Sequence, residues 1–138
     1  MIIDSIREFM KKCPLLESGR KINVDYLSSN PVEYSIDSIP SDTTIKTYVD
    51  GGKVKQFVFT FSSKEYYGSD VLTNIENSGF YEDLQYWFED SSKRLDLPIL
   101  SNGRESMSIE TLSSGYLFQA DEDKARYQIQ LRLVYYED

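Results

Sequence analysis

The chain has 138 residues and a formal net charge of −8 at pH 7, and it contains no histidine and one cysteine. The lack of histidine excludes Ser-His-Asp and Cys-His catalysis and zinc sites built on histidine, and the lone Cys13 can form no internal disulfide bond. A chain of this length can bury its own core, so we predict a single domain over residues 1–138.

The acidic excess lies in the second half of the chain. Residues 1–69 carry nine basic and nine acidic side chains, whereas residues 70–138 carry six basic and fourteen acidic ones. Proteins that bind nucleic acid neutralise phosphates with a basic surface. We therefore expect no specific DNA binding, and an acidic surface would let DNA pass without adhering to it.

An amphipathic helix is predicted over residues 2–12. Apolar residues recur at helical spacing, and Pro14 ends the pattern; they are Ile2, Ile6, Phe9 and Cys13. This stripe indicates packing on the sheet of the same protein, with Ile6 and Phe9 in the core. Cys13 continues the stripe, which favours a small buried side chain over a nucleophile.

Residues 22–67 are predicted to be β-structure. Alternating apolar residues indicate strands near residues 22–26, 32–36, 45–49 and 54–61. The last two strands flank a turn at Asp50-Gly51-Gly52 and so predict a hairpin. Three side chains at a spacing of two predict the core face of the last strand, namely Phe57, Phe59 and Phe61.

A helical region is predicted after Gly68. Ser69-Asp70 offers an N-cap, and Asn77-Ser78-Gly79 interrupts the helical spacing before a segment that runs to about Arg94. Two short helices or one kinked helix fit this pattern equally, and we describe the region as a helix pair. Leu84 and Trp87 fall on one helical face and are predicted to anchor it on the sheet.

The remaining residues predict more strands. Residues 95–103 suit a connection or a short edge strand, and strands are expected at 106–111, 116–119 and 127–136. The core face of the closing strand holds Ile129, Leu131 and Leu133. The predicted fold is α+β: an antiparallel or mixed β-sheet with an N-terminal helix and a central helix pair packed on one face.

The sequence contains no clear motif for catalysis, for a metal or for a cofactor. The only glycine pair lies in the predicted hairpin turn, and neither a phosphate-binding lysine nor a helix follows it. Acidic runs such as Glu82-Asp83 and Asp121-Glu122-Asp123 are typical of solvated surfaces. We predict a non-enzymatic protein without a cofactor; an enzyme that acts through exposed carboxylates is the weakest alternative.

No segment has the length and apolar character of a signal peptide or a membrane span, so we expect synthesis in the cytoplasm and no membrane contact. Eleven tyrosines favour surfaces that contact other proteins, because tyrosine combines apolar area with a polar tip.

Segments in both halves of the chain carry a family resemblance. They are Cys13–Leu16, Ile22–Leu27, Tyr67–Tyr81, Leu84 with Trp87, Leu97-Pro98 and Ala125–Leu131. Together these segments resemble small minor capsid or tail-completion proteins of bacteriophages and prophages of Gram-positive bacteria. The likeness covers most of the chain, and its motifs are structural.

The resemblance implies a tail terminator: a structural protein that forms a ring, often a hexamer, on the end of a finished tail tube. Its expected partners are copies of itself, the tail tube protein and the head-tail connector protein. Its expected place is the head-tail junction of the virion, where DNA passes through the ring without specific binding. Two alternatives stay open: a head-completion or connector-adaptor protein, and a cytosolic acidic interaction module.

The predicted hairpin at residues 45–61 is the candidate contact in such a ring. A protruding hairpin with basic flanks can meet an acidic face of a neighbouring subunit. The candidate interface residues are Tyr48, Lys53 and Lys55.

Overall fold

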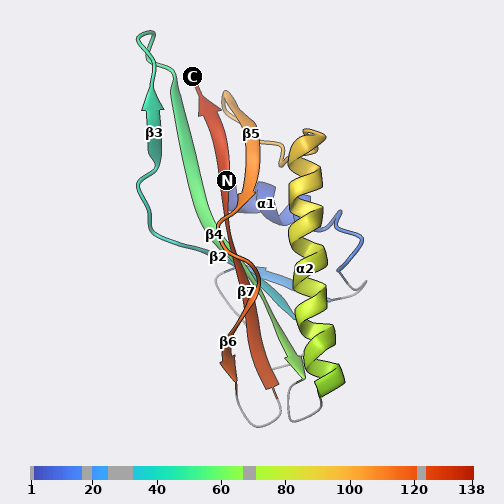
Figure 1. Ribbon diagram of the computed structural model, residues 1–138. Coiled ribbons are helices and arrows are strands. Elements are labelled where there is room, and N and C mark those ends of the chain that lie inside the picture. Colours follow the sequence, from blue (N-terminus) through green and yellow to red (C-terminus); the bar gives the residue numbers. More distant parts are fainter. Residues whose placement is uncertain (1, 17–19, 25–32, 67–70, 121–123) are drawn as a thin grey trace.

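The computed structural model describes residues 2–16, 20–24, 33–66, 71–120 and 124–138 (Figure 1). Two helices and seven strands follow one another in the order α1 (Ile2–Met10), β1 (Ile22–Val24), β2 (Tyr34–Ser38), β3 (Thr44–Thr47), β4 (Lys53–Tyr66), α2 (Val71–Lys93), β5 (Arg104–Thr111), β6 (Tyr116–Ala120) and β7 (Lys124–Glu137). The predicted N-cap at Ser69-Asp70 and the acidic run at 121–123 lie outside the described residues.

The seven strands form one mixed sheet with the order β1-β2-β4-β7-β5. The β1 and β2 strands are parallel, and the other pairs are antiparallel. In addition, β3 pairs with β4 and β6 pairs with β7. The α+β class and the mixed sheet are therefore confirmed.

Two long strands form the axis of this sheet. The β4 and β7 strands have 14 residues each and pair along their whole length, from Lys53 opposite Glu137 to Tyr66 opposite Lys124. At one end of this axis β3 and β5 flank the pair, and at the other end β2 and β6 do so (Figure 1). We call the end with β3 and β5 the hairpin end.

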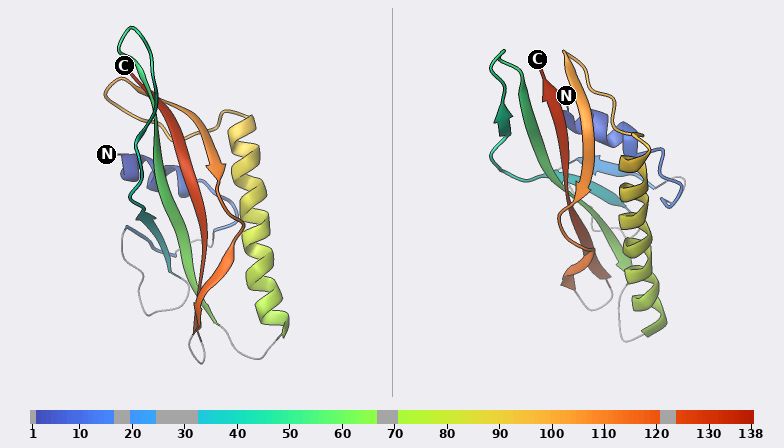
Figure 2. Two further views of the ribbon diagram at one scale, coloured as in Figure 1. Left: turned by 60° about the vertical axis from the view of Figure 1, so that its left-hand side comes forward. Right: turned by 45° about the horizontal axis from the view of Figure 1, so that its top comes forward.

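Both helices contribute to one core on a single face of the sheet. The views in Figure 2 show α2 running along the long strands, and the Phe9 ring of α1 lies 5.1 Å from the Trp87 ring of α2. The predicted core residues Ile6, Phe9, Phe59, Phe61, Leu84, Ile129, Leu131 and Leu133 are buried. The other two, Phe57 and Trp87, are partly buried against that core.

The central helical region is one helix, so the predicted helix pair is wrong. Helix α2 runs for 23 residues and passes without a break through Asn77-Ser78-Gly79. The buried side chains of Tyr81, Leu84 and Phe88 hold it on the sheet. Their burial outweighs the cost of about 1 kcal/mol that a glycine imposes inside a helix.

A buried hydroxyl network ties α2 to the two long strands. The Tyr81 hydroxyl lies 2.7 Å from Ser63 Oγ on β4 and donates a hydrogen bond of 3.0 Å to the Tyr127 carbonyl on β7. Burial raises the pKa of Tyr81, so this phenol stays protonated and keeps its donor. Gly115 lies against the same ring, and a Cβ at residue 115 would come within 2.3 Å of Tyr81 Cβ.

Gly79→Ala tests whether α2 is continuous. No atom lies within 4 Å of a Cβ built at Gly79, so the substitution should stabilise the protein by about 0.5–1 kcal/mol, the usual gain inside a helix. Urea unfolding measures the change. The matched control Gly115→Ala should destabilise the protein, because its methyl group collides with Tyr81. Unchanged or lower stability in Gly79→Ala would contradict a single helix.

Candidate assembly surface

The β3–β4 hairpin is shaped by its turn residues. The Tyr48 amide donates to the Gly52 carbonyl at 2.7 Å, and the Gly52 amide donates to Asp50 Oδ1 at 3.1 Å. Gly51 adopts a φ of 93°, which L side chains rarely reach. A Cβ at Gly52 would lie 2.0 Å from Tyr136 Oη, so a side chain at residue 52 would displace the end of the Tyr136 side chain.

This hairpin projects from one end of the sheet (Figure 1). Every residue from 41 to 51 is exposed, including the apolar side chains of Ile45 and Val49. Val49 at the tip is fully exposed, and Ile45 is 48% exposed. The hairpin therefore presents apolar side chains to solvent where they make little contact with their own chain.

The three predicted interface residues differ in how far their side chains are free to contact another subunit. Tyr48 is 40% exposed, with its ring 6.2 Å from that of Tyr136 and with Lys46 Nζ 4.8 Å from its centre. Lys53 is exposed. Lys55 instead forms an ion pair of 2.5 Å with Glu137 of the same chain, so its charge is already compensated.

The Lys55–Glu137 hydrogen bond shifts both groups toward their charged forms. It raises the pKa of Lys55 and lowers the pKa of Glu137. Because the two residues lie on β4 and β7, this pair ties the base of the hairpin to the C-terminal strand. No pattern in the sequence indicates this pairing, since the partners are far apart along the chain.

The sheet face away from the helices is lined by polar side chains that are paired with one another. Arg126 bonds Asp37 at 2.7 Å and Ser62 Oγ at 3.3 Å, which links β7, β2 and β4. Gln130 donates to the Tyr116 hydroxyl at 3.2 Å, and Arg132 forms an ion pair with Glu110. No pattern in the sequence predicts this network, because it depends on the strand order.

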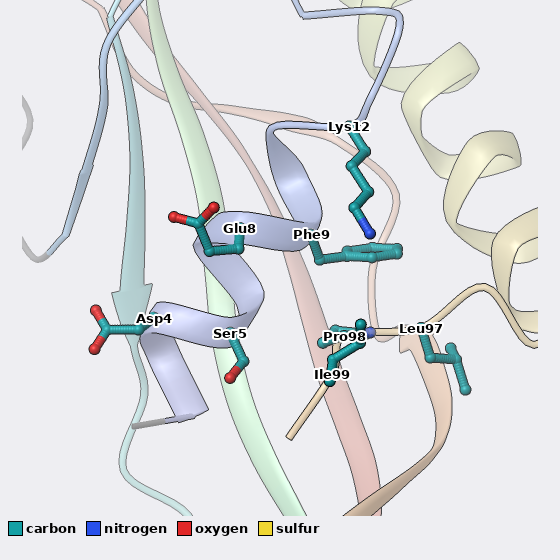
Figure 3. A pocket seen from close by; sticks show the side chains of 8 residues that line it. All are labelled: Asp4, Ser5, Glu8, Phe9, Lys12, Leu97, Pro98 and Ile99. Atoms are coloured by element: carbon teal, nitrogen blue, oxygen red, sulfur yellow. The ribbon is translucent and has the colours of Figure 1, made fainter. Parts of the chain in front are cut away.

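A groove lies between α1 and residues 97–99, with a volume of about 290 Å³. Figure 3 shows its apolar floor, formed by Phe9, Leu97 and Pro98, and the Asp4 and Glu8 carboxylates directed away from that floor. Glu8 pairs with Lys11 at 2.9 Å, and this contact lowers the pKa of its carboxyl group. The groove therefore offers apolar contact area, and the polar side chains of Ser5 and Lys12 also line it.

Among the described residues, no group of three or more His, Cys, Asp or Glu side chains is placed to hold a metal ion. In the same part of the chain, no helix has the length and apolar character required to cross a membrane. The buried Cys13 is a free thiol whose pKa is raised by desolvation.

Comparison with known protein families and with curated proteins finds no match to this chain.

The Lys55–Glu137 pair predicts a dependence of stability on acid. The pKa of Glu137 in the folded protein lies below its ordinary value of 4.5, so the pair stabilises the fold above that pH. This contribution is lost as the pH falls through the folded pKa. Urea unfolding between about pH 3 and pH 6 should therefore show a weaker acid dependence in Lys55→Met than in the parent chain. Lys53 lies opposite Glu137 and acts on its carboxyl group through charge alone, so Lys53→Met should weaken the acid dependence less than Lys55→Met does. Equal slopes in the parent chain and in Lys55→Met would contradict the pair.

Lys53→Gln tests the hairpin as a contact. Lys53 is exposed and lies opposite Glu137 in the strand register, so removal of its charge should change the melting temperature little while self-association through the hairpin weakens. Sedimentation at several salt concentrations measures the association. Lys53→Glu and Lys55→Glu are less suitable variants, because each would set two carboxylates together at Glu137. Parental association of Lys53→Gln would remove Lys53 from the interface.

Proposed function

We propose that this chain is a non-enzymatic phage structural protein, a tail terminator that forms a ring on the tail tube and joins it to the head connector. The observation that carries this proposal is the projecting β3–β4 hairpin, which is exposed throughout residues 41–51 and bears apolar side chains at its tip. Exposed apolar residues on a rigid projection suit a surface that becomes buried against another subunit. The resemblance of the sequence to minor capsid and tail-completion proteins supports the same role.

The rigidity of the hairpin supports an assembly role. Its base is tied to β7 by Lys55 and Glu137, and its turn packs Gly52 against Tyr136. A projection that is ordered before contact loses little conformational entropy when it docks. The hairpin can therefore act as a preformed contact element.

The charge of α2 supports a ring through which DNA passes. Its exposed acidic side chains follow the length of the helix: Glu76, Glu82, Asp83, Glu89 and Asp90. Lys93 is the basic residue of its last turn. A surface with this charge repels the phosphate backbone, so we propose that α2 faces the lumen of the ring. A ring structure with a basic lumen would overturn this placement.

The proposed partners are other copies of this chain, the tail tube protein and the connector protein, and the proposed site is the head-tail junction of the virion. The head-completion adaptor is the second candidate, because it would also use a projecting contact element in a ring. A cytosolic module that presents the acidic face of α2 to a basic partner is the third candidate.

Deletion of the gene in its phage tests the proposed function. Without a terminator, tube growth is not stopped, so electron microscopy should show tails of irregular length that are not joined to heads. Expression of the intact gene from a plasmid should restore normal virions.

Two other outcomes would identify the rival roles. Tails of normal length that fail to join heads would favour the head-completion adaptor. Normal virions in the deletion strain would contradict both virion roles and would favour the cytosolic module.

A further inference from the structure

At the hairpin end the sheet is four strands wide, and its two edges lie level with each other. One row of paired residues runs through Thr47, Lys53, Glu137 and Arg104, and the next row runs through Lys46, Val54, Tyr136 and Glu105. The first residue of each row lies on β3, and the last lies on β5. The β3 and β5 strands are therefore the opposite edges of one sheet at the same height.

The directions of these strands match across copies. Each neighbour in the order β3-β4-β7-β5 is antiparallel to the next, so β3 and β5 run in opposite directions. When two copies stand side by side in the same orientation, the β3 edge of one therefore meets the β5 edge of the other as an antiparallel pair. A contact between two different edges can repeat from copy to copy. It closes into a ring if each copy is rotated relative to the previous one by a fraction of a full turn that closes the circle.

Both edges have free backbone groups. The Tyr48 amide bonds Gly52 on the β4 side, so strand alternation directs the Thr47 amide toward the open side of β3. On β5, the Ile109 amide donates a hydrogen bond of 3.3 Å to Ser92 Oγ of α2. The 95–101 segment is held to the first half of β5, Arg104–Met107, by side chains: Arg104 Nε donates to the Ser101 carbonyl at 2.9 Å, and Ser106 Oγ donates to the Pro98 carbonyl at 2.5 Å. Among the described residues, no backbone hydrogen bond joins the two, so the backbone groups on this edge of β5 are not used by that segment.

The side chains of the two edges are complementary. Each edge has a register irregularity that leaves one apolar side chain exposed: Ile45 on β3 and Met107 on β5, with exposures of 48% and 45%. Lys46 and Glu105 are both exposed, belong to the same row and lie on the same face of the sheet. Opposite charges on neighbouring strands stabilise a pair, and like charges destabilise it.

We propose that β3 of one copy adds to the first half of β5 of the next copy, with Lys46 beside Glu105 and Ile45 close to Met107. The sheet then continues from subunit to subunit, and both exposed apolar side chains become buried. This inference deepens the proposed function and rests on it, since the contact belongs to a closed ring of this chain.

The other open edge on the β5 side does not suit a ring. The β6 strand pairs with β7 at Ala125–Gln128, the end of the sheet far from β3. Pairing of β3 with β6 would shift each copy along the strands relative to the last one. Such a shift builds a filament rather than a closed ring.

A pair of cysteines tests the contact directly. In Lys46→Cys/Glu105→Cys, the new thiols of adjacent copies would lie on neighbouring strands, within reach of a disulfide bond. The native Cys13 is buried and 4% exposed, so it should not interfere. Mild oxidation of the concentrated protein should give a ladder of covalent oligomers on a non-reducing gel, and the same ladder should appear in purified virions.

The single-cysteine variants are the controls, and dimer formation by one of them would contradict the proposed contact. Lys46→Cys and Glu105→Cys alone should stay monomeric on the same gel. Rapid dimer formation by Lys46→Cys alone would show two β3 edges paired with each other and would overturn the proposal. The absence of a ladder from the double variant, in solution and in virions, would also overturn it.

Charge reversal tests the partner assignment. Lys46→Glu and Glu105→Lys should each weaken self-association by about fivefold, because each sets like charges together at every contact. An equimolar mixture of the two variants should restore association. When the variants alternate, the new glutamate of one meets the new lysine of the other, and at the next contact the unchanged lysine meets the unchanged glutamate. Failure of the mixture to recover would overturn this pairing, provided that both variants keep the parental circular dichroism spectrum.

These tests separate the contact from the biological role. If gene deletion gives irregular tails but the double-cysteine variant gives no ladder, the terminator function stands and the β3–β5 contact is wrong. If the isolated protein gives the ladder but deletion leaves normal virions, the contact stands and the function is wrong.

Discussion

The structure depends on the full-length pairing of β4 with β7. This pairing sets Phe57, Phe59 and Phe61 opposite Leu133, Leu131 and Ile129, so one face of both strands supplies the sheet side of the core. A slip of one residue in either strand would turn the three side chains of that strand to the other face, and the two helices would lose half of this packing surface. The hydrophobic pattern thus fixes the register, and the register places the flanking strands. At the hairpin end it brings β3 and β5 level with each other, and at the other end it positions Ser63 and Tyr127 to receive the Tyr81 hydroxyl.

The same register organises the face away from the helices. Arg126, Asp37 and Ser62 come from three strands and meet only because those strands are adjacent. Most polar side chains on this face are thereby engaged with one another, which holds the sheet in one shape. Exposed apolar groups lie elsewhere: Val49, Ile45 and Met107 at the hairpin tip and at strand edges, and Ile75 and Ile99 on α2 and on the connection after it. The molecule therefore combines a rigid face with contact elements at its margins.

Much of this fold could be predicted from the sequence, because alternation in β4 and β7 and the helical stripe of α1 are local patterns. The continuity of α2 could not: Asn77-Ser78-Gly79 has a low helix propensity, and only the burial of Tyr81 against β4 and β7 explains why the helix persists. The candidate surface was found in part. Gly51-Gly52 indicated the hairpin, but the ion pair of Lys55 with Glu137 and the alignment of Lys46 with Glu105 depend on the pairing of strands that are far apart in the sequence. The spacing of residues along the chain predicts neither the ion pair nor the alignment.

Charge and contact area together bear on how a ring of this protein would form. Each copy carries a net charge of −8, so free copies repel one another, and the β3–β5 edge offers only a few residues of strand pairing. Contacts of this size are weak on their own. Under the proposed function, a finished tail tube would hold the copies at the required spacing and raise their effective concentration. Ring formation would then follow tube completion rather than precede it. A terminator needs the tube to be completed before the ring closes, because a ring that closed in solution would form whether or not a tube is finished.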